Sequence, residues 1–330
     1  MRRFYNQILQ AISIGKKNVW EIIDYCDLSL FEFVKNFPKN RIEKLFEKVK
    51  NNINLKKIKN IEDLSCNICQ GTGYKIDKFF TQILKEYKKE VRNRPEALEI
   101  YDQGYINPEG VIRRIEFIYE RGDLLNSRIL IIGDDDLISI ALGLTYLTKE
   151  IVVLEIDERL INFINDKARQ LKLNVKAYRY NVENELPKNL QRKFDIFITD
   201  PVETLPGIKL FLSRGMTGLK DKGSSGYFGL TTLEASLKKW YQIERFLLDS
   251  GFVITDIKRK FNQYPGTTEA IEEKLPIRSI YNNKIKAEEW YKSSFIRIEA
   301  INKPKIFYKQ KLILGENLYR DNESLATPIV

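Results

Sequence analysis

Histidine is absent from the 330 residues of this chain, and cysteine occurs only three times. Without histidine, the chain lacks the usual general base, a serine-type catalytic triad and every histidine-ligated metal site. Three cysteines are too few for a disulfide framework. No apolar run is long enough to span a bilayer, and the first residues are amphipathic. We therefore expect a cytoplasmic protein without membrane contact, in which Asp, Glu, Tyr, Cys or Lys carries out any proton transfer.

Two of the cysteines, Cys66 and Cys69, enclose a short turn of the kind found in zinc ribbons. Four-coordinate zinc needs two more ligands, and a second cysteine pair is missing. A second chain in a dimer could supply them, but an isolated pair is more often a buried turn. The favoured interpretation is that the chain holds no metal.

Positive charge is in excess, with a formal net charge of +10. Such an excess suggests a polyanionic partner such as nucleic acid. The basic residues are, however, spread along helices, as in residues 44–57 and 85–89, without an RNA-binding signature. Charge-rich composition is also typical of thermophile proteins. A solvated basic surface is therefore favoured over a nucleic-acid partner.

The pattern of apolar residues divides the chain into four parts. Residues 1–75 have helical spacing and predict a small winged-helix-like domain, for which packing or homodimer formation is favoured over DNA binding. Residues 76–122 predict connecting helices and a substrate loop. Residues 123–302 alternate between strands and helices, which predicts a Rossmann-like catalytic domain with a parallel sheet. Residues 303–330 lose periodicity and predict an irregular, mobile tail.

The third part contains seven expected strands, and the last two are expected to be antiparallel because they are adjacent in sequence. This count is typical of an α/β, methyltransferase-like Rossmann sheet. The strands are expected at 128–132, 151–156, 175–180, 194–199, 226–231, 252–258 and 294–300, with helices near 137–145, 159–170, 208–215 and 233–248.

Three consecutive aspartates, Asp134, Asp135 and Asp136, follow the first expected strand and Gly133. In a doubly wound fold this turn lies under the ligand and usually contains glycines. Three carboxylates would repel the carboxylate of S-adenosylmethionine and attract a ligand that ends in an ammonium. Capping of the next helix is the alternative, and it explains one aspartate comfortably. The triplet predicts a nucleoside-type pocket adapted to cations.

Polar residues also end the second and third expected strands. Glu155 closes the second strand, where an acidic residue usually binds ribose hydroxyls, and Asp157 follows it. Asn181 follows the third strand and could hydrogen-bond an adenine edge. Because the carboxyl ends of parallel strands share one edge of the sheet, these residues are expected near the aspartate triplet.

The fourth expected strand ends in Asp200-Pro201-Val202-Glu203. Pro201 restricts the backbone there and holds the carboxylate of Asp200 at the rim of the sheet. Carboxylates that share a pocket raise one another's pKa, which suits a group that must take a proton from an amine. A salt-bridge network with Lys209 or Arg214 is the structural alternative.

Three motifs resemble those of aminopropyltransferases such as spermidine synthase. They are Ile131-Ile132-Gly133-Asp134-Asp135-Asp136, Leu154-Glu155-Ile156-Asp157 and Phe194-Asp195-Ile196-Phe197-Ile198-Thr199-Asp200. The Gly-Asp-Asp-Asp turn is more similar still to that of the branched-chain polyamine synthases of thermophilic prokaryotes, the N4-bis(aminopropyl)spermidine synthase family. The resemblance covers nearly the whole chain, including Asp102-Gln103-Gly104-Tyr105 and Tyr227-Phe228-Gly229.

The resemblance implies transfer of the aminopropyl group of decarboxylated S-adenosylmethionine, a co-substrate, to the secondary amine of spermidine. No other cofactor is implied, because the sulfonium already activates the carbon. Asp136 would bind the aminopropyl ammonium, Asp200 would orient and deprotonate the amine, and Glu203 would be a second anchor. This chain has Val202 where a second proline is expected, and Glu203 where spermidine synthases have Asp.

The remaining site residues follow from the same resemblance. Gly133, Asp134, Asp135, Glu155, Asp157, Asn181 and Gln103 would surround the nucleoside, and Asp102, Tyr105, Tyr227 and Tyr264 the amine. Tyr101 and Phe228 join the last three as expected cation–π walls for a quaternary ammonium product.

Two alternatives use the same sheet. A methyltransferase acting on nucleic acid would fit the basic surface, but the acidic first turn opposes the carboxylate of its cofactor. A winged-helix regulator that senses a polyamine would need anionic walls but no base at a reactive carbon. Asp200 discriminates between the regulator and the enzyme.

Overall fold

The computed structural model describes residues 2–16, 18–26, 28–51, 75–265 and 291–324. In this part of the chain, one seven-stranded sheet has the strand order β3-β2-β1-β4-β5-β7-β6. The strands are β1 (Arg128–Ile132), β2 (Glu150–Glu155), β3 (Val175–Arg179), β4 (Ile196–Thr199), β5 (Ser225–Leu230), β6 (Phe252–Gln263) and β7 (Lys292–Ala300).

The first five strands pair in parallel, and β7 is antiparallel to both β5 and β6. The predicted methyltransferase-like α/β fold is therefore confirmed, together with the antiparallel last pair. The chain returns from β6 so that β7 lies between β5 and β6. Strand β6 also continues beyond residue 258, where the sequence prediction ended it.

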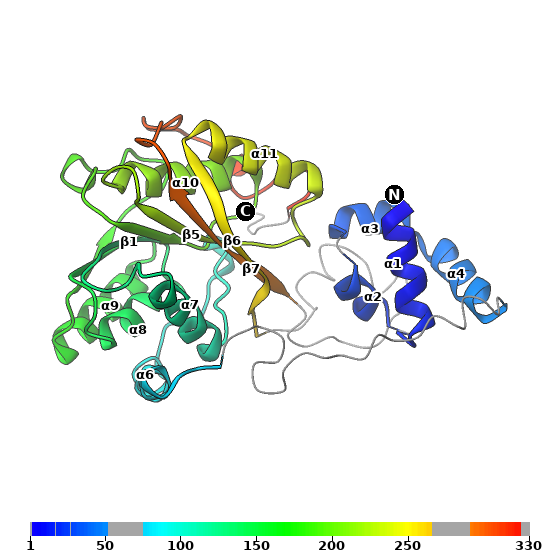
Figure 1. Cartoon of the computed structure of the whole chain (residues 1–330), viewed down its shortest axis with the longest axis horizontal. Coiled ribbons are helices and arrows are strands. Elements are labelled where there is room, and N and C mark those ends of the chain that lie inside the picture. Colours follow the sequence, from blue (N-terminus) through cyan, green and yellow to red (C-terminus); the bar gives the residue numbers. More distant parts are fainter. Residues whose placement is uncertain (1, 17, 27, 52–74, 266–290, 325–330) are drawn as a thin grey trace.

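Strand β1 has apolar side chains on both faces, so helices must cover both faces of the sheet. Ile129 and Ile131 belong to one hydrophobic core and Leu130 and Ile132 to another, because successive side chains of a strand alternate between faces. Figure 1 shows the two helical layers. One layer contains α6 (Lys78–Glu90), α7 (Pro108–Glu120), α8 (Ile138–Leu144) and α9 (Glu158–Leu171), and the other contains α10 (Leu205–Gly218) and α11 (Leu237–Asp249).

The expected helices are present with shifted ends. Helix α10 begins at Leu205 because the side chain of Thr204 caps it by accepting a hydrogen bond from the Gly207 backbone. Helix α11 begins at Leu237 because Ser236 caps it in the same way through Lys239. The caps therefore correct the predicted starts at residues 208 and 233.

The N-terminal part forms a separate helical unit beside the sheet (Figure 1). Its helices are α1 (Arg2–Ser13), α2 (Val19–Tyr25), α3 (Leu30–Asn36) and α4 (Lys39–Asn51), packed around Trp20 and Phe33. Leu233 of the α/β domain joins this core, and its carbonyl accepts a hydrogen bond from the Leu30 backbone. Cys66 and Cys69 lie outside the described residues, so the winged-helix form and the cysteine site stay predictions.

The described part of the C-terminal segment, residues 303–324, packs against the α/β domain. The guanidinium of Arg214 donates to the backbone carbonyls of Tyr308, Lys309 and Gln310. Among the described residues, short 3-10 helices are η1 (Glu99–Tyr101), η2 (Lys188–Leu190) and, within this segment, η3 (Gly315–Leu318). The expectation of a loose tail did not include this packing.

A bilayer span would need a longer apolar helix than any that the described residues form. The predicted cytoplasmic location stays a prediction.

Candidate active site

A cavity of about 800 Å³ opens beyond the carboxyl ends of β1, β2 and β4, the edge where open α/β sheets bind ligands. Leu318 and Tyr319 of the C-terminal segment form part of its wall. Arg320 is the one positively charged residue among the described residues that line it. The described acidic lining residues are Asp102, Asp135, Glu155, Glu183, Asp200, Glu203, Glu234 and Glu316.

The charge of this cavity is therefore opposite to that of the whole chain, which has a net charge of +10. A field of one sign in a cleft with low-dielectric walls attracts ligands of the other sign. The cavity is suited to a cationic ligand, as the strand-end residues predicted.

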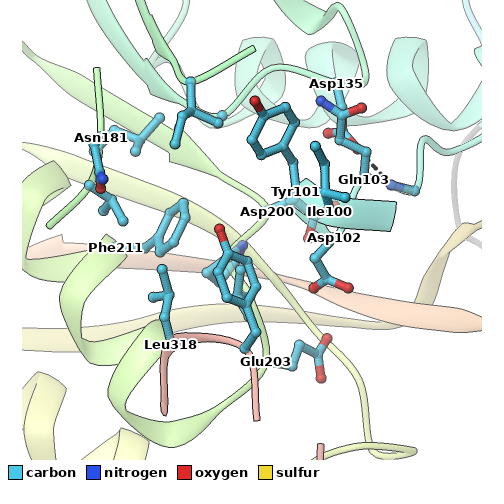
Figure 2. A pocket seen from close by; sticks show the side chains of 18 of the residues that line it. Ile100, Tyr101, Asp102, Gln103, Asp135, Asn181, Asp200, Glu203, Phe211 and Leu318 are labelled. Atoms are coloured by element: carbon cyan, nitrogen blue, oxygen red, sulfur yellow. Dashed lines mark hydrogen bonds between the residues drawn. The ribbon is translucent and has the colours of Figure 1, made fainter. Parts of the chain in front are cut away.

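One end of the cavity is mainly apolar. Figure 2 shows Asn181, Phe211 and Leu318 on one side of the cavity, with Asp102, Gln103 and Asp135 on the other. The Oδ1 atom of Asn181 accepts a hydrogen bond from the Glu183 backbone, at 2.8 Å. An apolar slot with one amide suits a flat heterocycle. The apolar residues Ile132, Leu154, Ile156 and Val182 also line the cavity.

Glu155, the predicted ribose ligand, lies at the end of β2 and lines the cavity. Its Oε2 atom accepts a hydrogen bond from the Asp134 backbone at 2.8 Å. Its Oε1 atom accepts from the backbones of Ile156 and Asp157. Burial raises the pKa of this carboxyl in spite of the three hydrogen bonds. The bonds fix the carboxylate, and its contact with a ribose stays a prediction.

The aspartate triplet divides among three environments. Asp135 lines the cavity, and its Oδ2 atom accepts a hydrogen bond from the Gly104 backbone at 2.8 Å. Asp134 is buried below the turn and accepts from the backbone of Ser139. Asp136 is buried and faces α7. Gly133, with a φ of +72°, starts the turn in the left-handed conformation that favours glycine.

Asp135 has a pKa suited to proton transfer. Burial raises the pKa of Asp135 to about 6, and the charge of Asp200 acts in the same direction. A carboxyl with a pKa near neutrality can accept a proton and release it again at physiological pH. Burial also raises the pKa of Asp136 to about 7, so the place of Asp135 in the cavity lining distinguishes it within the triplet.

Asp200 follows β4 and also lines the cavity, with 21% of its side chain exposed. Its Oδ2 atom accepts a hydrogen bond from Nη2 of Arg114 at 2.8 Å and another from the hydroxyl of Tyr264 at 2.7 Å. Neither Lys209 nor Arg214, the partners of the structural alternative, forms a described ion pair with it. The counter-charge of Asp200 is Arg114 from α7.

Asp136, the predicted ligand of the aminopropyl ammonium, lies beside Arg114. Its Oδ2 atom lies 2.7 Å from Nη1 of Arg114, and its Oδ1 atom accepts from the Ile106 backbone at 2.7 Å. It is not among the described residues that line the cavity. Three consecutive residues of a tight turn cannot all face one cavity, and Asp136 faces the buried guanidinium instead.

Besides Phe228, four other predicted residues also lie away from the described cavity lining. Asp134 lies beneath the turn, and Asp157 caps α9 (Glu158–Leu171) while pairing with Arg159 at 2.6 Å. Tyr105 stacks under the guanidinium of Arg94, 3.8 Å from the ring centroid. Tyr227 is fully buried in the core, where its hydroxyl donates to Asp123.

Only some of the aromatic residues that were expected to surround the product line the cavity. Phe228 is buried in the opposite core, beside α10 and α11. Tyr101 and Tyr264 do line the cavity, as do Asp102 and Gln103. The amide nitrogen of Gln103 donates to Asp157 at 3.1 Å, which connects the substrate loop to the end of β2.

Glu203 and Glu234 form a second acidic cluster in the cavity wall. The Oε1 atom of Glu203 accepts from the Thr231 backbone at 2.8 Å. Its Oε2 atom is buried and has no hydrogen-bond partner among the described residues. Burial and the neighbouring Glu234 raise the pKa of Glu203 well above its ordinary value. An ammonium placed beside Oε2 would satisfy that atom and offset the charge.

Sequence reasoning missed Arg114 and Glu234. A signal for Arg114 was available, because it lies three residues after Val111 and four before Ile118, on the face of α7 that the helical period buries. No local signal marks Glu234, which follows β5 in an irregular stretch. Its position depends on how that stretch folds over the sheet.

Comparison with known proteins gives one consistent family. The matching family model is the branched-chain polyamine synthase A C-terminal domain, over residues 82–326. The N(4)-bis(aminopropyl)spermidine synthase of Methanocaldococcus jannaschii is 43% identical over 265 residues, which are 79% of this chain and 75% of that protein. The protein of the same name from Thermococcus kodakarensis is 41% identical, over 80% of this chain and 75% of that protein.

A solved structure agrees with these relatives. It is the branched-chain polyamine synthase from Thermus thermophilus in complex with N4-aminopropylspermidine and 5'-methylthioadenosine, and it matches this chain with a TM-score of 0.82. The two are 27% identical, and the match covers 97% of this chain and 93% of that one. The resemblance found in the sequence motifs is confirmed, and this chain belongs to the branched-chain polyamine synthase A family.

Proposed function

We propose that this chain transfers the aminopropyl group of decarboxylated S-adenosylmethionine to the secondary amine of spermidine. Two rounds give N4-aminopropylspermidine and then N4-bis(aminopropyl)spermidine, with methylthioadenosine released in each. The observation that carries the proposal is the cavity itself, which joins an apolar slot to an acidic wall. The names of the relatives from Methanocaldococcus jannaschii and Thermococcus kodakarensis support the same activity.

The reaction exchanges one bond for another. The amine nitrogen attacks the aminopropyl carbon next to the sulfonium, the carbon–sulfur bond breaks, and its electron pair stays on the sulfur of methylthioadenosine. In the first round the nitrogen also loses its proton. Because the sulfonium already activates the carbon, the protein must align the amine, exclude water and keep the attacking nitrogen unprotonated.

Asp135 is our proposed general base, and Asp200 our proposed anchor for the amine. Asp135 lines the cavity, has its pKa near neutrality and accepts a hydrogen bond from the Gly104 backbone. Asp200 is held by Arg114 and Tyr264 through one oxygen, which fixes the direction of its carboxylate. Asp136 is not proposed to contact substrate.

The nucleoside is proposed to occupy the apolar end. Glu155 would bind the ribose, and Asn181 and Gly133 would contact the nucleoside around Phe211. Gln103, Asp102, Tyr101 and Tyr264 would lie between the nucleoside and the amine. This arrangement is supported by the presence of all of these residues in the lining of one cavity.

Glu203 and Glu234 are proposed to bind a terminal ammonium of the polyamine. We expect Glu203→Gln to raise KM for spermidine about tenfold, because a charge-assisted hydrogen bond contributes roughly 1.5 kcal/mol more than a neutral one. The turnover number at saturation is expected to change less than about threefold. Steady-state kinetics with varied spermidine would check this.

Glu150→Gln provides the control for that variant. Glu150 starts β2 at the opposite edge of the sheet, and 45% of its side chain is exposed. Its replacement is expected to leave both constants unchanged. An unchanged KM in Glu203→Gln would contradict the ammonium subsite.

The proposed function is tested by incubating the purified chain with decarboxylated S-adenosylmethionine and a panel of linear polyamines. Mass spectrometry should detect methylthioadenosine together with spermidine heavier by one and then two aminopropyl groups. Methylthioadenosine without a heavier amine would indicate hydrolysis and would count against the proposal. Methyl transfer from S-adenosylmethionine under the same conditions would favour the methyltransferase alternative.

Neither alternative is favoured by a specific observation. The acidic lining opposes the carboxylate of S-adenosylmethionine, and a regulator has no use for a carboxyl poised near neutrality at the cavity wall. A homodimer stays a prediction, and a nucleic-acid partner is not proposed.

A further inference from the structure

Arg114 lies at the centre of a buried polar network beneath the cavity. Its Nη1 atom donates to Asp136 at 2.7 Å, its Nη2 atom to Asp200 at 2.8 Å, and its Nε atom to Asn262 at 2.8 Å. The guanidinium also lies over the ring of Phe295, 5.0 Å from the centroid. Only 2% of its side chain is exposed, so the charge of Arg114 is compensated almost entirely by protein groups.

Donation to three separate acceptors requires the geometry of a guanidinium. The three nitrogen atoms of arginine donate in fixed directions within one plane, whereas a lysine ammonium is a single point charge. Here the three acceptors come from the β1 turn, the β4 turn and β6 (Phe252–Gln263). Arg114 therefore connects three parts of the chain that are distant in sequence.

The network also fixes the direction of the Asp200 carboxylate. Its Oδ2 atom accepts from both Arg114 and Tyr264, and the amide of Asn262 and the hydroxyl of Tyr264 meet at Ser293. The Oδ1 atom lies so close to Gly229 that a Cβ there would be 1.9 Å away. Both oxygens of Asp200 are thus located by the protein before any substrate binds.

Several carboxylates surround Asp200. The carboxylates of Asp135, Asp136 and Glu203 all interact with it, and Tyr264 offers only a neutral hydroxyl. Arg114 is the cation in contact with it among the described residues. A guanidinium at hydrogen-bond distance stabilises the ionised carboxylate.

We propose that Arg114 is a positioning residue that holds the Asp200 carboxylate in a fixed direction as the anchor of the amine, while Asp135 exchanges a proton with the amine. This inference rests on the proposed function, since it assigns separate tasks to the two carboxylates of that site. The inference also accounts for the buried ion pair between Arg114 and Asp136. Asp136 shares the guanidinium and fixes its plane through the Ile106 and Tyr87 contacts.

The test compares Arg114→Gln and Arg114→Lys with the wild type across a pH series from about pH 6 to about pH 9. The charge of Arg114 lowers the pKa of Asp136, so its removal raises that pKa and Asp136 takes up a proton at a higher pH. In Arg114→Gln we expect the acid limb of kcat/KM to move to higher pH and kcat to fall about a hundredfold. Arg114→Lys retains the charge. We expect its pH profile of kcat/KM to lie close to that of the wild type, while its kcat stays below the wild-type value.

Spermidine binding provides a second readout that does not need turnover. Calorimetry should show that Arg114→Gln binds spermidine more weakly than wild type at the acid end of the series. At the alkaline end, where Asp136 is ionised in both proteins, the difference should become smaller. Methylthioadenosine binding should change by less than about threefold throughout.

Arg297→Lys and Arg297→Gln are the matched controls. Arg297 is another buried arginine that bridges polar groups, with Nε on Asp123 and Nη2 on Ser225, but it lies near the start of β5. Its variants should lower the Tm and leave the shape of the pH profile unchanged.

The outcomes separate the inference from the proposed function. An inactive wild type, with every amine in the panel, would overturn the proposed function. If the wild type is active, a pH profile of kcat/KM for Arg114→Gln that has the same shape as the wild-type profile and only a lower height would overturn the positioning role. If Arg114→Gln does not fold, the inference depends on Arg114→Lys, and a wild-type rate for that variant would overturn it.

Discussion

Replacing Asp135 with Asn is expected to reduce kcat about a thousandfold while methylthioadenosine binding changes by less than about threefold. Asn is nearly isosteric and can still accept the hydrogen bond from the Gly104 backbone, so the turn should keep its shape. The substitution removes the group that we propose takes the proton. Single-turnover kinetics with decarboxylated S-adenosylmethionine and spermidine would measure the effect on the chemical step.

The same variant has an expected effect on stability. The folded protein raises the pKa of Asp135 from its ordinary value of 3.8 to about 6, so the ionised form is less stable in the fold than in the unfolded chain. Its stabilising contribution is complete below about pH 4 and is lost as pH rises through about 6. Asp135→Asn should therefore have a higher Tm than wild type above about pH 6, and the difference should shrink towards about pH 4. A functional carboxyl that costs stability is a common trade-off.

Asp195→Asn is the control for Asp135. Asp195 precedes β4, at the edge of the sheet opposite the cavity, where it accepts from the Arg128 backbone. Its replacement is expected to leave kcat unchanged. Wild-type turnover by Asp135→Asn would exclude this residue as the base.

Replacing Gly229 with Ala is expected to produce the second large loss of activity. A Cβ at this position would lie 1.9 Å from Oδ1 and 2.9 Å from Cγ of Asp200, so the carboxylate must move. Movement would break the bonds that Asp200 accepts from Arg114 and Tyr264. We expect kcat/KM for spermidine to fall about a hundredfold, because an anchor displaced by about 1 Å misaligns the attacking nitrogen.

Gly226→Ala separates this effect from general damage to the strand. Gly226 lies on the same strand, β5, and its Cβ would meet the ring of Phe197 at 2.3 Å in the core. Both variants should lower the Tm, and only Gly229→Ala should lose turnover per folded molecule. Equal kcat/KM values for the two variants would show that Asp200 does not need its observed position.

The fold was predictable because its signals are local. In β1 the buried side chains of both faces are consecutive, Ile129 to Ile132, and this pattern is typical of a parallel strand covered on two sides. Strands of this kind alternate with amphipathic helices, which restricts the topology to a doubly wound sheet. The insertion of β7 between β5 and β6 was not predictable, because it depends on pairing between distant strands.

The edge of the sheet that holds the site was predictable for a related reason. Polar residues follow several strands directly, and parallel strands bring those residues together. Asp135, Glu155 and Asp200 accordingly line one cavity. Tyr227 was predicted there as well, but it belongs to the middle of β5 and not to its end, so its side chain enters the core.

The orientation of individual side chains was decided by contacts between distant residues. Arg114 and Asp200 are 86 residues apart, Tyr264 and Asp200 are 64 apart, and Arg114 and Asn262 are 148 apart. These contacts turn Asp136 towards a buried guanidinium and leave Asp135 at the cavity wall. No pattern within the triplet distinguishes its three members.

The order of residues along the chain sufficed for the fold class, the family and the acidic edge of the sheet, because strand periodicity and strand-end chemistry act over a few residues. The tertiary structure alone distinguished the environments of the individual carboxylates. A carboxyl's charge state and direction depend on the cations, donors and degree of burial around it, and here those come from α7, from β6 and from the C-terminal segment. Electrostatic and packing interactions act through space, so they become defined only when distant parts of the chain meet.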